Sequence, residues 1–468
     1  MKRIAIVGGG IAGLTAAYEL ARKDDPAVEV VLFEASSRLG GIVETVREGG
    51  FIIECGPDAW VTEKPWAREL SEELGLGNEV MPSNDAARKT YVLIDGQLEA
   101  MPDGMRMMVP ADLDALDASA LFSAKAKQAY RDEVARAESL KASAPAQDES
   151  VASFVQRHFG DEVLEKIGAP LLRGVFGGDV TELSVRAVMA PFVAMEREHG
   201  SLVAAMQIRA AAKEGKEAAI FTTLRSGLGR LVDSMVAAIP AGWIRLSTAV
   251  HSIAYGNRRW TLKTSKSEES FDAVIMAAPV HAARELLRPI DARAAQLMEM
   301  NASSAVVVAF GFPDAEKFTV PPGFGFLVPE GSNNLLLACT FVDQKFADRV
   351  PKNGRLVRAF FGGAAAERLI KCGNDETAAI ARLELARLLG PLPEPQVTVV
   401  RRWPRSLPQY GVGHLERMAE LDERVGRLNG LSLLGNGYRG VGLPDLIRDA
   451  RAAARQIAGE SKTSEGEK

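Results

Sequence analysis

The first 42 residues constrain the fold more than any other stretch. From residue 2 they read KRIAIVGGGIAGLTAAYELARKDDPAVEVVLFEASSRLGGI. A short run of apolar and β-branched residues at 4–7 leads into a glycine turn at 8–13, and a helical pattern follows. A second apolar run, at 28–33, ends in Glu34, about 20 residues after the last glycine of the turn. This order predicts a β-α-β unit that binds a dinucleotide.

Each glycine of such a turn, and the acid after it, has a physical role. Gly8 permits the tight turn, Gly10 lets backbone N–H groups approach a pyrophosphate, and Gly13 allows the helix and the strand to pack closely. The helix N-terminus then faces the anion. Glu34 is suited to accept hydrogen bonds from a ribose hydroxyl and would repel a 2′-phosphate, which disfavours NADP.

A secretory signal is the competing interpretation of this end of the chain. Lys2 and Arg3 precede an apolar run and so imitate the start of a signal peptide. Three consecutive glycines, charged residues in the predicted helix and a second strand that ends in an acid fit a folded unit better. We therefore expect the stretch to be part of a domain.

Composition restricts the function classes. The chain has 468 residues, enough for two or three domains, and a net charge of −5 without a Lys/Arg run interleaved with aromatic residues. A nucleic-acid partner is therefore not expected. Cys55, Cys339 and Cys372 lack CxxC spacing, which predicts a reducing compartment, no disulfide framework and no metal site. The apolar runs fall far short of the roughly 18 residues that span a bilayer, so any membrane contact is expected to be peripheral.

The residues after Glu34 discriminate between dinucleotides. Arg38-Leu39-Gly40-Gly41 places a basic residue and a glycine pair where the chain returns towards the cofactor. This E-x-x-x-R-x-G-G pattern resembles the FAD-binding signature of the flavin amine oxidase superfamily. The resemblance implies that FAD is the cofactor, with Arg38 and the glycine backbone against the pyrophosphate and the flavin.

A second signature lies inside a helical stretch. Residues 170–184 read PLLRGVFGGDVTELS and resemble a signature of the oxygen-dependent protoporphyrinogen oxidases and the related coproporphyrinogen III oxidases that form coproporphyrin. The resemblance covers nearly the whole chain, from residue 3 to about residue 457. Four further stretches resemble sequences of the same family: 149–160, 223–231, 401–414 and 435–447.

This resemblance implies an α/β fold in three parts: a Rossmann-like discontinuous FAD-binding domain, a substrate domain with an antiparallel sheet, and a helical insertion. Short alternating strands between 303 and 408 agree with such a sheet. The FAD-binding domain is expected at 1–85, 222–290 and 409–468, the substrate-binding domain at 86–100, 185–221 and 291–408, and the helical insertion, which could associate with a membrane, at 101–184.

The resemblance also implies a set of site residues. Val250 is expected to hold the adenine through its backbone, and Trp403 to pack by the cofactor. Lys64, Arg173 and Phe176 are expected at the substrate, where Lys64 could pair with a propionate; a solvated lysine, a surface arginine and a core phenylalanine are the structural alternatives. The residues expected to bind FAD are Gly8, Gly9, Gly10, Gly13, Leu14, Glu34, Ala35, Arg38, Gly41, Ile42, Gly56, Pro57, Asp58, Ala59, Val250, Trp403, Gly435, Asn436, Val441, Gly442 and Leu443.

The implied activity is oxidation of a porphyrinogen to a porphyrin by O2 in haem biosynthesis, with non-covalently bound FAD. The first substrate to consider is protoporphyrinogen IX, which becomes protoporphyrin IX; the alternative is coproporphyrinogen III, which becomes coproporphyrin III. Six electrons leave the substrate, and three H2O2 form. A hydride passes to flavin N5, so no catalytic side chain is predicted. The protein is expected in the cytoplasm. The sequence leaves open whether it contacts the cytoplasmic face of the membrane and whether it forms a homodimer.

Three other interpretations share the N-terminal signature. An amine or polyamine oxidase typically has a flavin-linked Cys near the C-terminal motif or a Lys on the substrate sheet, whereas here no Cys follows Cys372 and residues 303–312 contain no Lys. A carotenoid desaturase on the same scaffold is the second interpretation. A non-catalytic FAD-binding protein is the third, because a fold does not prove a function. Turnover with peroxide formation would exclude the third.

Overall fold

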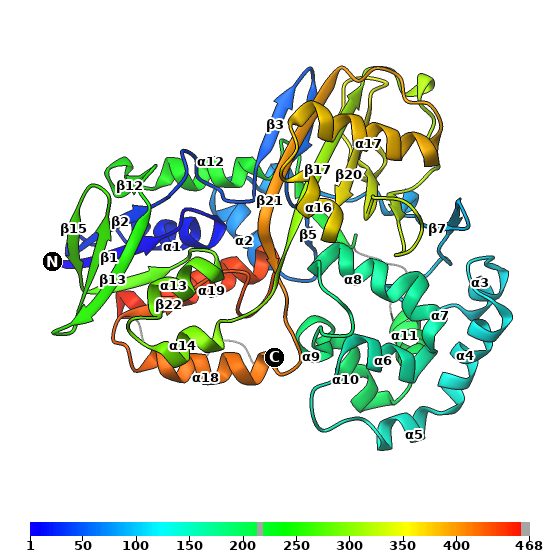
Figure 1. Cartoon of the computed structure of the whole chain (residues 1–468), viewed down its shortest axis with the longest axis horizontal. Helices are drawn as coiled ribbons and strands as arrows, with labels where there is room; N and C mark the ends of the chain where they lie inside the picture. The colour runs from blue at the N-terminus through cyan, green and yellow to red at the C-terminus, as the bar shows by residue number, and fades with distance from the viewer. Residues whose placement is uncertain (213–218, 460–468) are drawn as a thin grey trace.

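The computed structural model describes residues 1–212 and 219–459 and has three parts (Figure 1). One part is built on a parallel sheet that contains the N-terminal strand, and a second on a larger, mainly antiparallel sheet. The third part is helical and lies below the larger sheet in the view of Figure 1. The α/β class and the three-part arrangement predicted from the sequence are confirmed.

The parallel sheet has the strand order β12-β2-β1-β16-β22. Its three central strands are short, largely apolar and mostly buried, as expected for a parallel sheet that is covered on both faces, whereas the two edge strands are only partly buried. The strands of the sheet come from three distant parts of the chain, so the first part of the molecule is discontinuous. The strands are β1 (Lys2–Val7), β2 (Val28–Phe33), β12 (Ile244–Arg245), β16 (Ala273–Met276) and β22 (Leu431–Leu433).

Helices cover one face of this sheet, and helices together with a small antiparallel sheet cover the other. On the first face, Leu14, Leu231 and Ile447 share one apolar core. On the second face, Phe33, Trp260 and Leu287 share another. The first face carries α1 (Ile11–Ala21), α2 (Trp66–Glu73), α12 (Gly229–Ala238) and α19 (Leu443–Ala458), and the second β13 (Val250–Gly256), β14 (Arg259–Thr264), β15 (Glu268–Phe271), α13 (Val280–Leu287), α14 (Ala292–Leu297) and α18 (His414–Gly426).

The larger sheet has the order β21-β17-β20-β19-β18-β7-β8 and is antiparallel except where β18 pairs with β7. The long strands β17 (Ala302–Phe312) and β21 (Val397–Pro408) pair along most of their length. The remaining elements are β7 (Thr90–Ile94), β8 (Gln97–Ala100), β18 (Gly325–Leu327), β19 (Ala338–Phe341), β20 (Arg355–Phe361), the packed helices α15 (Val342–Lys345), α16 (Gly363–Leu369) and α17 (Asn374–Leu389), and the hairpin β3 (Thr45–Glu48) and β4 (Phe51–Glu54).

The helical part has one apolar core, in which Tyr130, Phe154 and Val203 are buried. Within 1–212 and 219–459, no helix is long and apolar enough to cross a membrane. The predicted domain boundaries stay a prediction, although α9–α11 share this core and not that of the larger sheet. The elements are β9 (Met105–Arg106), β10 (Val109–Pro110), α3 (Leu113–Ala118), α4 (Ala124–Ala135), α5 (Ala137–Ala142), α6 (Val151–Phe159), α7 (Asp161–Val163), a π-helical turn (Leu164–Gly168), α8 (Ala169–Phe176), α9 (Val185–Val188), α10 (Ala190–His199) and α11 (Leu202–Ala212).

Candidate active site

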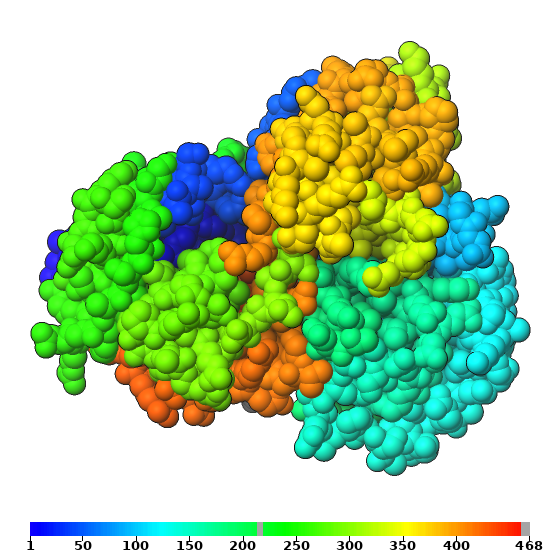
Figure 2. Space-filling view, in the orientation of Figure 1, coloured from blue at the N-terminus to red at the C-terminus, as the bar shows by residue number. Residues whose placement is uncertain are grey.

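A cavity of about 640 Å³ lies at the carboxyl ends of the parallel strands. This is the edge at which open α/β sheets bind their ligands. Figure 2 shows the surface hollowed where the N-terminal segment, in dark blue, lies recessed between green and orange segments. Most residues predicted to bind FAD line this one cavity: Gly8, Gly10, Glu34, Ala35, Gly41, Ile42, Pro57, Ala59, Val250, Trp403, Gly435, Asn436, Val441, Gly442 and Leu443.

Two glycines of the turn are needed for close packing, and a third leaves space for a ligand. Gly8 has a φ of +111°, and a Cβ there would lie 2.5 Å from the Ala277 oxygen. A Cβ on Gly13 would lie 1.9 Å from the Gly8 oxygen, so these two glycines are required by the turn and by the close approach of α1 to β1. A Cβ on Gly10 would have its nearest neighbour 3.9 Å away, at Gly41. Gly10 therefore leaves room for a ligand at the N-terminus of α1.

The carboxylate of Glu34 is held in a fixed orientation at the end of β2. One oxygen accepts a hydrogen bond from the Gly9 N–H at 2.7 Å, and the other accepts one from the Ser36 N–H at 2.7 Å. Glu34 also lines the cavity. Each carboxylate oxygen has further lone pairs for hydroxyl donors, so the geometry suits the predicted contact with a ribose.

We expect Glu34→Ala to weaken FAD binding by about tenfold to a hundredfold, because hydrogen bonds to a charged group contribute about 1.5–3 kcal/mol. Glu34→Gln keeps an acceptor for the Gly9 N–H and is expected to lose less affinity. Glu29→Ala, on the same strand but paired with Arg3, is the matched control. Titration of the apo-protein with FAD, followed by flavin fluorescence, measures the affinity. Equal affinities for all three variants would contradict the ribose contact.

Arg38 stabilises the loop after β2 and does not line the cavity. Its guanidinium donates to the Leu39 oxygen at 3.2 Å and to the Gly41 oxygen, and it pairs with Glu44 at 3.4 Å. It also lies 5.6 Å from the ring centre of Trp403. A direct contact between Arg38 and the pyrophosphate stays a prediction, whereas its contacts in the structure are with the loop. The other predicted residues outside the lining are Gly9, Gly13, Leu14, Gly56 and Asp58.

Trp60, Phe221 and Leu443 line one part of the cavity, where β5 contacts β11 and α19, and we call this part the inner end. Trp60 and Phe221 come from β5 (Trp60–Val61) and β11 (Phe221–Leu224), which form a small sheet with β6 (Val80–Pro82). Leu443 begins α19, whose N-terminus carries partial positive charge. The inner end is therefore mostly apolar, with a helix N-terminus at its edge.

Lys64 is the predicted substrate residue that lines the cavity. Its ammonium donates to both oxygens of Asp445, at 2.6 and 2.8 Å, in the first turn of α19. The lysine side chain is 46% exposed and the Asp445 side chain 6% exposed. Lys64 is thus a cation that faces solvent at the cavity while it covers a buried carboxylate.

Arg173 and Phe176 lie on α8, outside the lining of the cavity. Arg173 pairs with the exposed Glu330. The helix ends at Gly177, whose oxygen accepts hydrogen bonds from Ser303 and from Gln409 at 3.3 Å. The signature segment therefore connects the helical part to β17 and to the end of β21, and the substrate roles of Arg173 and Phe176 stay predictions.

Sequence reasoning missed part of the lining. Residues 277–282, which follow β16, contribute a continuous wall because β16 lies beside β1 in the sheet. Arg405 and Ser406, near the end of β21, contribute another. Residues 277–282 could have been found from the rule that the carboxyl ends of neighbouring parallel strands meet at one edge of a sheet. The rule could not be applied because the sequence does not show which strand lies next to β1.

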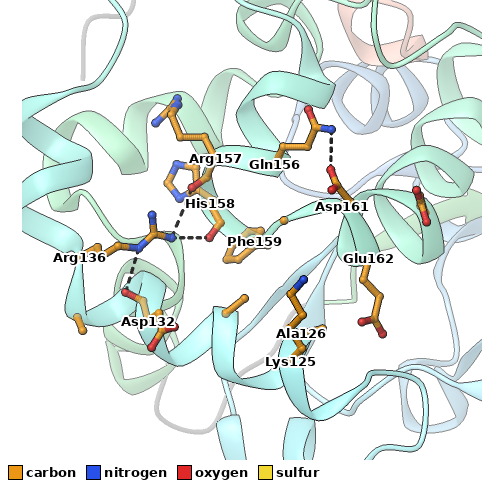
Figure 3. Close-up of a pocket in the computed structure, with 14 residues that line it drawn as sticks. Lys125, Ala126, Asp132, Arg136, Gln156, Arg157, His158, Phe159, Asp161 and Glu162 are labelled. Carbon is orange, nitrogen blue, oxygen red and sulfur yellow. Dashed lines mark hydrogen bonds between the residues drawn. The ribbon is translucent and has the colours of Figure 1, made fainter.

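A second cavity, of about 700 Å³, opens between α4 and α6 in the helical part (Figure 3). In Figure 3, Arg136 points towards the end of α6, where its guanidinium donates to the His158 oxygen at 3.1 Å. None of the residues predicted to bind FAD or substrate lines this cavity. Its charged lining residues have both signs, including Lys125, Asp132 and Glu165, and so select no ligand charge.

A buried ionic network lies at the back of this second cavity. His158 contacts Glu133 of α4 at 2.9 Å and Glu196 of α10 at 3.2 Å, and Arg157 also pairs with Glu196. Glu133 further accepts hydrogen bonds from the Ser201 hydroxyl at 2.5 Å and the Leu202 N–H at 2.6 Å. Burial opposes a charged His158, but the hydrogen bonds to Glu133 and Glu196 outweigh it and raise the pKa of His158 above its usual value.

The raised pKa predicts that the helical part loses stability in alkali. The protonated His158 contributes fully below the unfolded pKa, about 6.5, and its contribution is lost as the pH rises through the folded pKa, at about 1.4 kcal/mol for each unit of pKa difference. Amide hydrogen exchange of α6, corrected for intrinsic rates between pH 6 and 9, is expected to show falling protection. His158→Gln should abolish this pH dependence, and His199→Gln on α10 should retain it. If the protection of α6 falls with pH in His158→Gln as it does in the wild type, the imidazole is not the source of the pH dependence.

Comparison with known proteins agrees with the geometry of the first cavity. Residues 11–458 match the family described as flavin containing amine oxidoreductase. The chain is 33% identical to coproporphyrinogen III oxidase of Bacillus subtilis, over 97% of each chain, and 28% identical to protoporphyrinogen oxidase 2 of Arabidopsis thaliana, over 97% of this chain and 93% of the relative. A crystal structure from Exiguobacterium sp. 255-15, provisionally assigned as a protoporphyrinogen oxidase, superposes with a TM-score of 0.85 at 33% identity, over 97% of this chain and 98% of the other. The chain belongs to the family of flavin-containing amine oxidoreductases, and FAD is its cofactor.

Proposed function

We propose that the protein is an FAD-dependent oxidase that converts coproporphyrinogen III to coproporphyrin III with O2 as the acceptor. The observation that carries this proposal is the full-length likeness to the coproporphyrinogen III oxidase of Bacillus subtilis. Protoporphyrinogen IX, which the sequence analysis considered first, is the second candidate because the Arabidopsis relative is named a protoporphyrinogen oxidase. The cytoplasmic location, a homodimer and peripheral membrane contact stay predictions.

The proposed reaction removes six hydrogen atoms from the macrocycle and converts three O2 to three H2O2. Bound FAD supplies the acceptor for a hydride in each of three two-electron steps. The chain's own contribution is to hold the macrocycle against the inner end and to exclude water. Among the lining residues, the titratable side chains are Glu34, Lys64, His281 and Arg405. Trp60, Phe221 and Leu443 at the inner end carry no acid or base, which agrees with hydride loss from a carbon flanked by electron-rich pyrroles.

The charge of the substrate favours coproporphyrinogen III, which carries four propionates against the two of protoporphyrinogen IX. Lys64 and Arg173 are the cations that the sequence resemblance places at the substrate, and Arg106 on β9 is a further candidate. In the structure each pairs with a carboxylate, and Arg106 donates to both oxygens of the exposed Glu63 at 2.7 Å. Exposed ion pairs contribute little, about 0–1 kcal/mol, so a propionate could replace the exposed Glu63 or Glu330 at low cost.

The deciding experiment compares the two porphyrinogens. The purified FAD-loaded protein is incubated in air with each at equal concentration, and initial rates of porphyrin fluorescence and of peroxide formation are recorded. We expect the larger kcat/KM for coproporphyrinogen III, three H2O2 per porphyrin and, without O2, at most one porphyrin for every three bound flavins. A larger kcat/KM for protoporphyrinogen IX would select the second candidate. No turnover of either would overturn the proposal.

A further inference from the structure

A cluster of buried charges lies behind the cavity wall near the inner end. The Lys345 ammonium lies 3.0 and 3.1 Å from the two oxygens of Asp58, and a guanidinium nitrogen of Arg358 lies 3.3 Å from Asp58. Arg349 lies 3.4 Å from Glu54. We call these five residues the buried charge cluster. They join the end of β4 and the segment between β4 and β5 to α15, to β20 and to the loop between α15 and β20.

The buried charge cluster is separated from the cavity by one layer of residues. Asp58 stands between Pro57 and Ala59, which both line the cavity. Arg358 donates to the Gly56 oxygen in the same turn. The Lys345 ammonium lies 4.7 Å from the ring centre of Phe221, which forms part of the inner end. The charges therefore lie close to the cavity, although none of the five residues is part of its lining.

The buried charge cluster has an excess of positive charge. It contains three cations, Lys345, Arg349 and Arg358, and two carboxylates, Asp58 and Glu54. In the described part of the chain, the Nε atoms of both arginines are buried without a hydrogen-bond partner. Burial opposes a charged Asp58, but Lys345 and Arg358 hold its pKa below the usual value, whereas burial raises the pKa of Glu54. Buried charges are screened only weakly by salt and solvent.

The direction of FAD in the cavity follows from Glu34 and the glycine turn. The acid at the end of β2 marks the ribose of the adenosine half, and the N-terminus of α1 marks the diphosphate. The riboflavin half extends away from Glu34. On that side the cavity follows backbone contacts from Gly10 to Gly41 and from Ile42 to Gly56, and Pro57, Ala59 and Trp60 of the inner end come next along the chain. The ring system that accepts electrons is therefore the part of FAD next to the buried charge cluster.

We propose that the buried charge cluster raises the reduction potential of the bound flavin, with Lys345 and Asp58 as positioning residues of opposite effect. Two electrons and one proton add to the oxidised ring and leave one negative charge on it. A net positive cluster behind Phe221 stabilises that charge relative to the neutral oxidised ring. This inference rests on FAD binding in the cavity and is independent of which substrate is oxidised.

The test measures the midpoint potential of FAD at pH 7 by anaerobic reduction with a reference dye, so that no porphyrinogen is needed. Lys345→Met removes a cation at nearly constant volume and is expected to lower the reduction equilibrium constant about tenfold, which is about 30 mV for a two-electron couple. Asp58→Asn removes an anion and is expected to shift the potential in the opposite direction. The double variant should return close to the wild-type potential. Lys317→Met, at an exposed lysine, is the control and should show no shift.

Potential shifts of opposite sign in Lys345→Met and Asp58→Asn indicate an electrostatic role. A merely structural role predicts that both single variants shift the potential in the same direction. Shifts in the same direction, or no shift in either variant, would overturn the inference. If Lys345→Met does not fold, Asp58→Asn alone decides, since it must raise the potential. Failure to oxidise either porphyrinogen would overturn the proposed function and leave this measurement intact, whereas a wild-type protein that binds no FAD would overturn the inference.

Discussion

Replacing Gly13 by alanine is expected to leave the protein unable to bind FAD, because the first part of the molecule cannot pack. The added Cβ would lie 1.9 Å from the Gly8 backbone oxygen, a neighbour that cannot rotate away. Relieving that overlap requires α1 to move off β1, which we expect to cost about 3 kcal/mol or more in the free energy of unfolding. The melting temperature and the flavin absorbance of the purified protein measure both effects.

Gly10→Ala is the matched control for this prediction. Gly10 has a φ of −73°, which alanine tolerates, and its Cβ would meet no protein atom closer than 3.9 Å. The apo-protein should therefore melt at the wild-type temperature, while the methyl group reduces the room for the diphosphate and weakens FAD binding about tenfold or more, at about 1.4 kcal/mol per factor of ten. If Gly13→Ala retains normal stability and flavin, the turn is not packed as the structure shows.

Lys64→Met is expected to raise the KM for coproporphyrinogen III by about tenfold to a hundredfold, with a smaller effect on kcat and on FAD content. The variant keeps the aliphatic stem and removes the ammonium, and a hydrogen bond between two charged groups contributes about 1.5–3 kcal/mol. Initial rates across a range of substrate concentrations measure the effect. Arg68→Met, which removes an exposed cation paired with Glu72 on α2, is the control.

The partner of Lys64 distinguishes substrate binding from a structural role. Asp445 holds the ammonium in the structure, so Asp445→Asn would release it. If Lys64 binds a propionate, this variant should lower KM or leave it unchanged. If Lys64 only neutralises the buried Asp445, then Asp445→Asn should have no effect on KM, and the loss in Lys64→Met should disappear in the double variant. An unchanged KM in Lys64→Met would exclude the propionate contact.

The elements with strong local signals could be predicted from the sequence. The glycine turn and Glu34 stand where the predicted β-α-β unit puts them, because strand, turn and helix are each specified within a few residues. Residues of the C-terminal motif also line the cavity, with Gly442 preceding α19, and their contact with FAD stays a prediction. In both cases the residues that specify the local structure lie within one short segment of the chain.

Contacts between distant segments could not be predicted in this way. Lys345 and Arg358 meet Asp58 across nearly 300 positions, and nothing near them in the sequence indicates a charge partner. The position of β16 next to β1 is likewise set by the topology of the whole sheet. The contact of Arg38 with the pyrophosphate stays a prediction, because in the structure the acceptors near its long side chain are carbonyls of its own loop. The direction in which a long side chain points depends on which hydrogen-bond acceptors lie within its reach, and the sequence does not show this.

The packing of α1 against α19 has a consequence for biosynthesis. Leu14 and Ile447 share a core, and the Lys2 ammonium donates to the Ile457 oxygen, so the packing of α1 is completed only when α19 is present. A ribosome that stalls anywhere before α19 holds a nascent chain with an exposed apolar surface and half a cofactor site. Flavin capture in the cell must therefore follow the synthesis of α19, and any shortening that removes α19 should yield a colourless, aggregation-prone product.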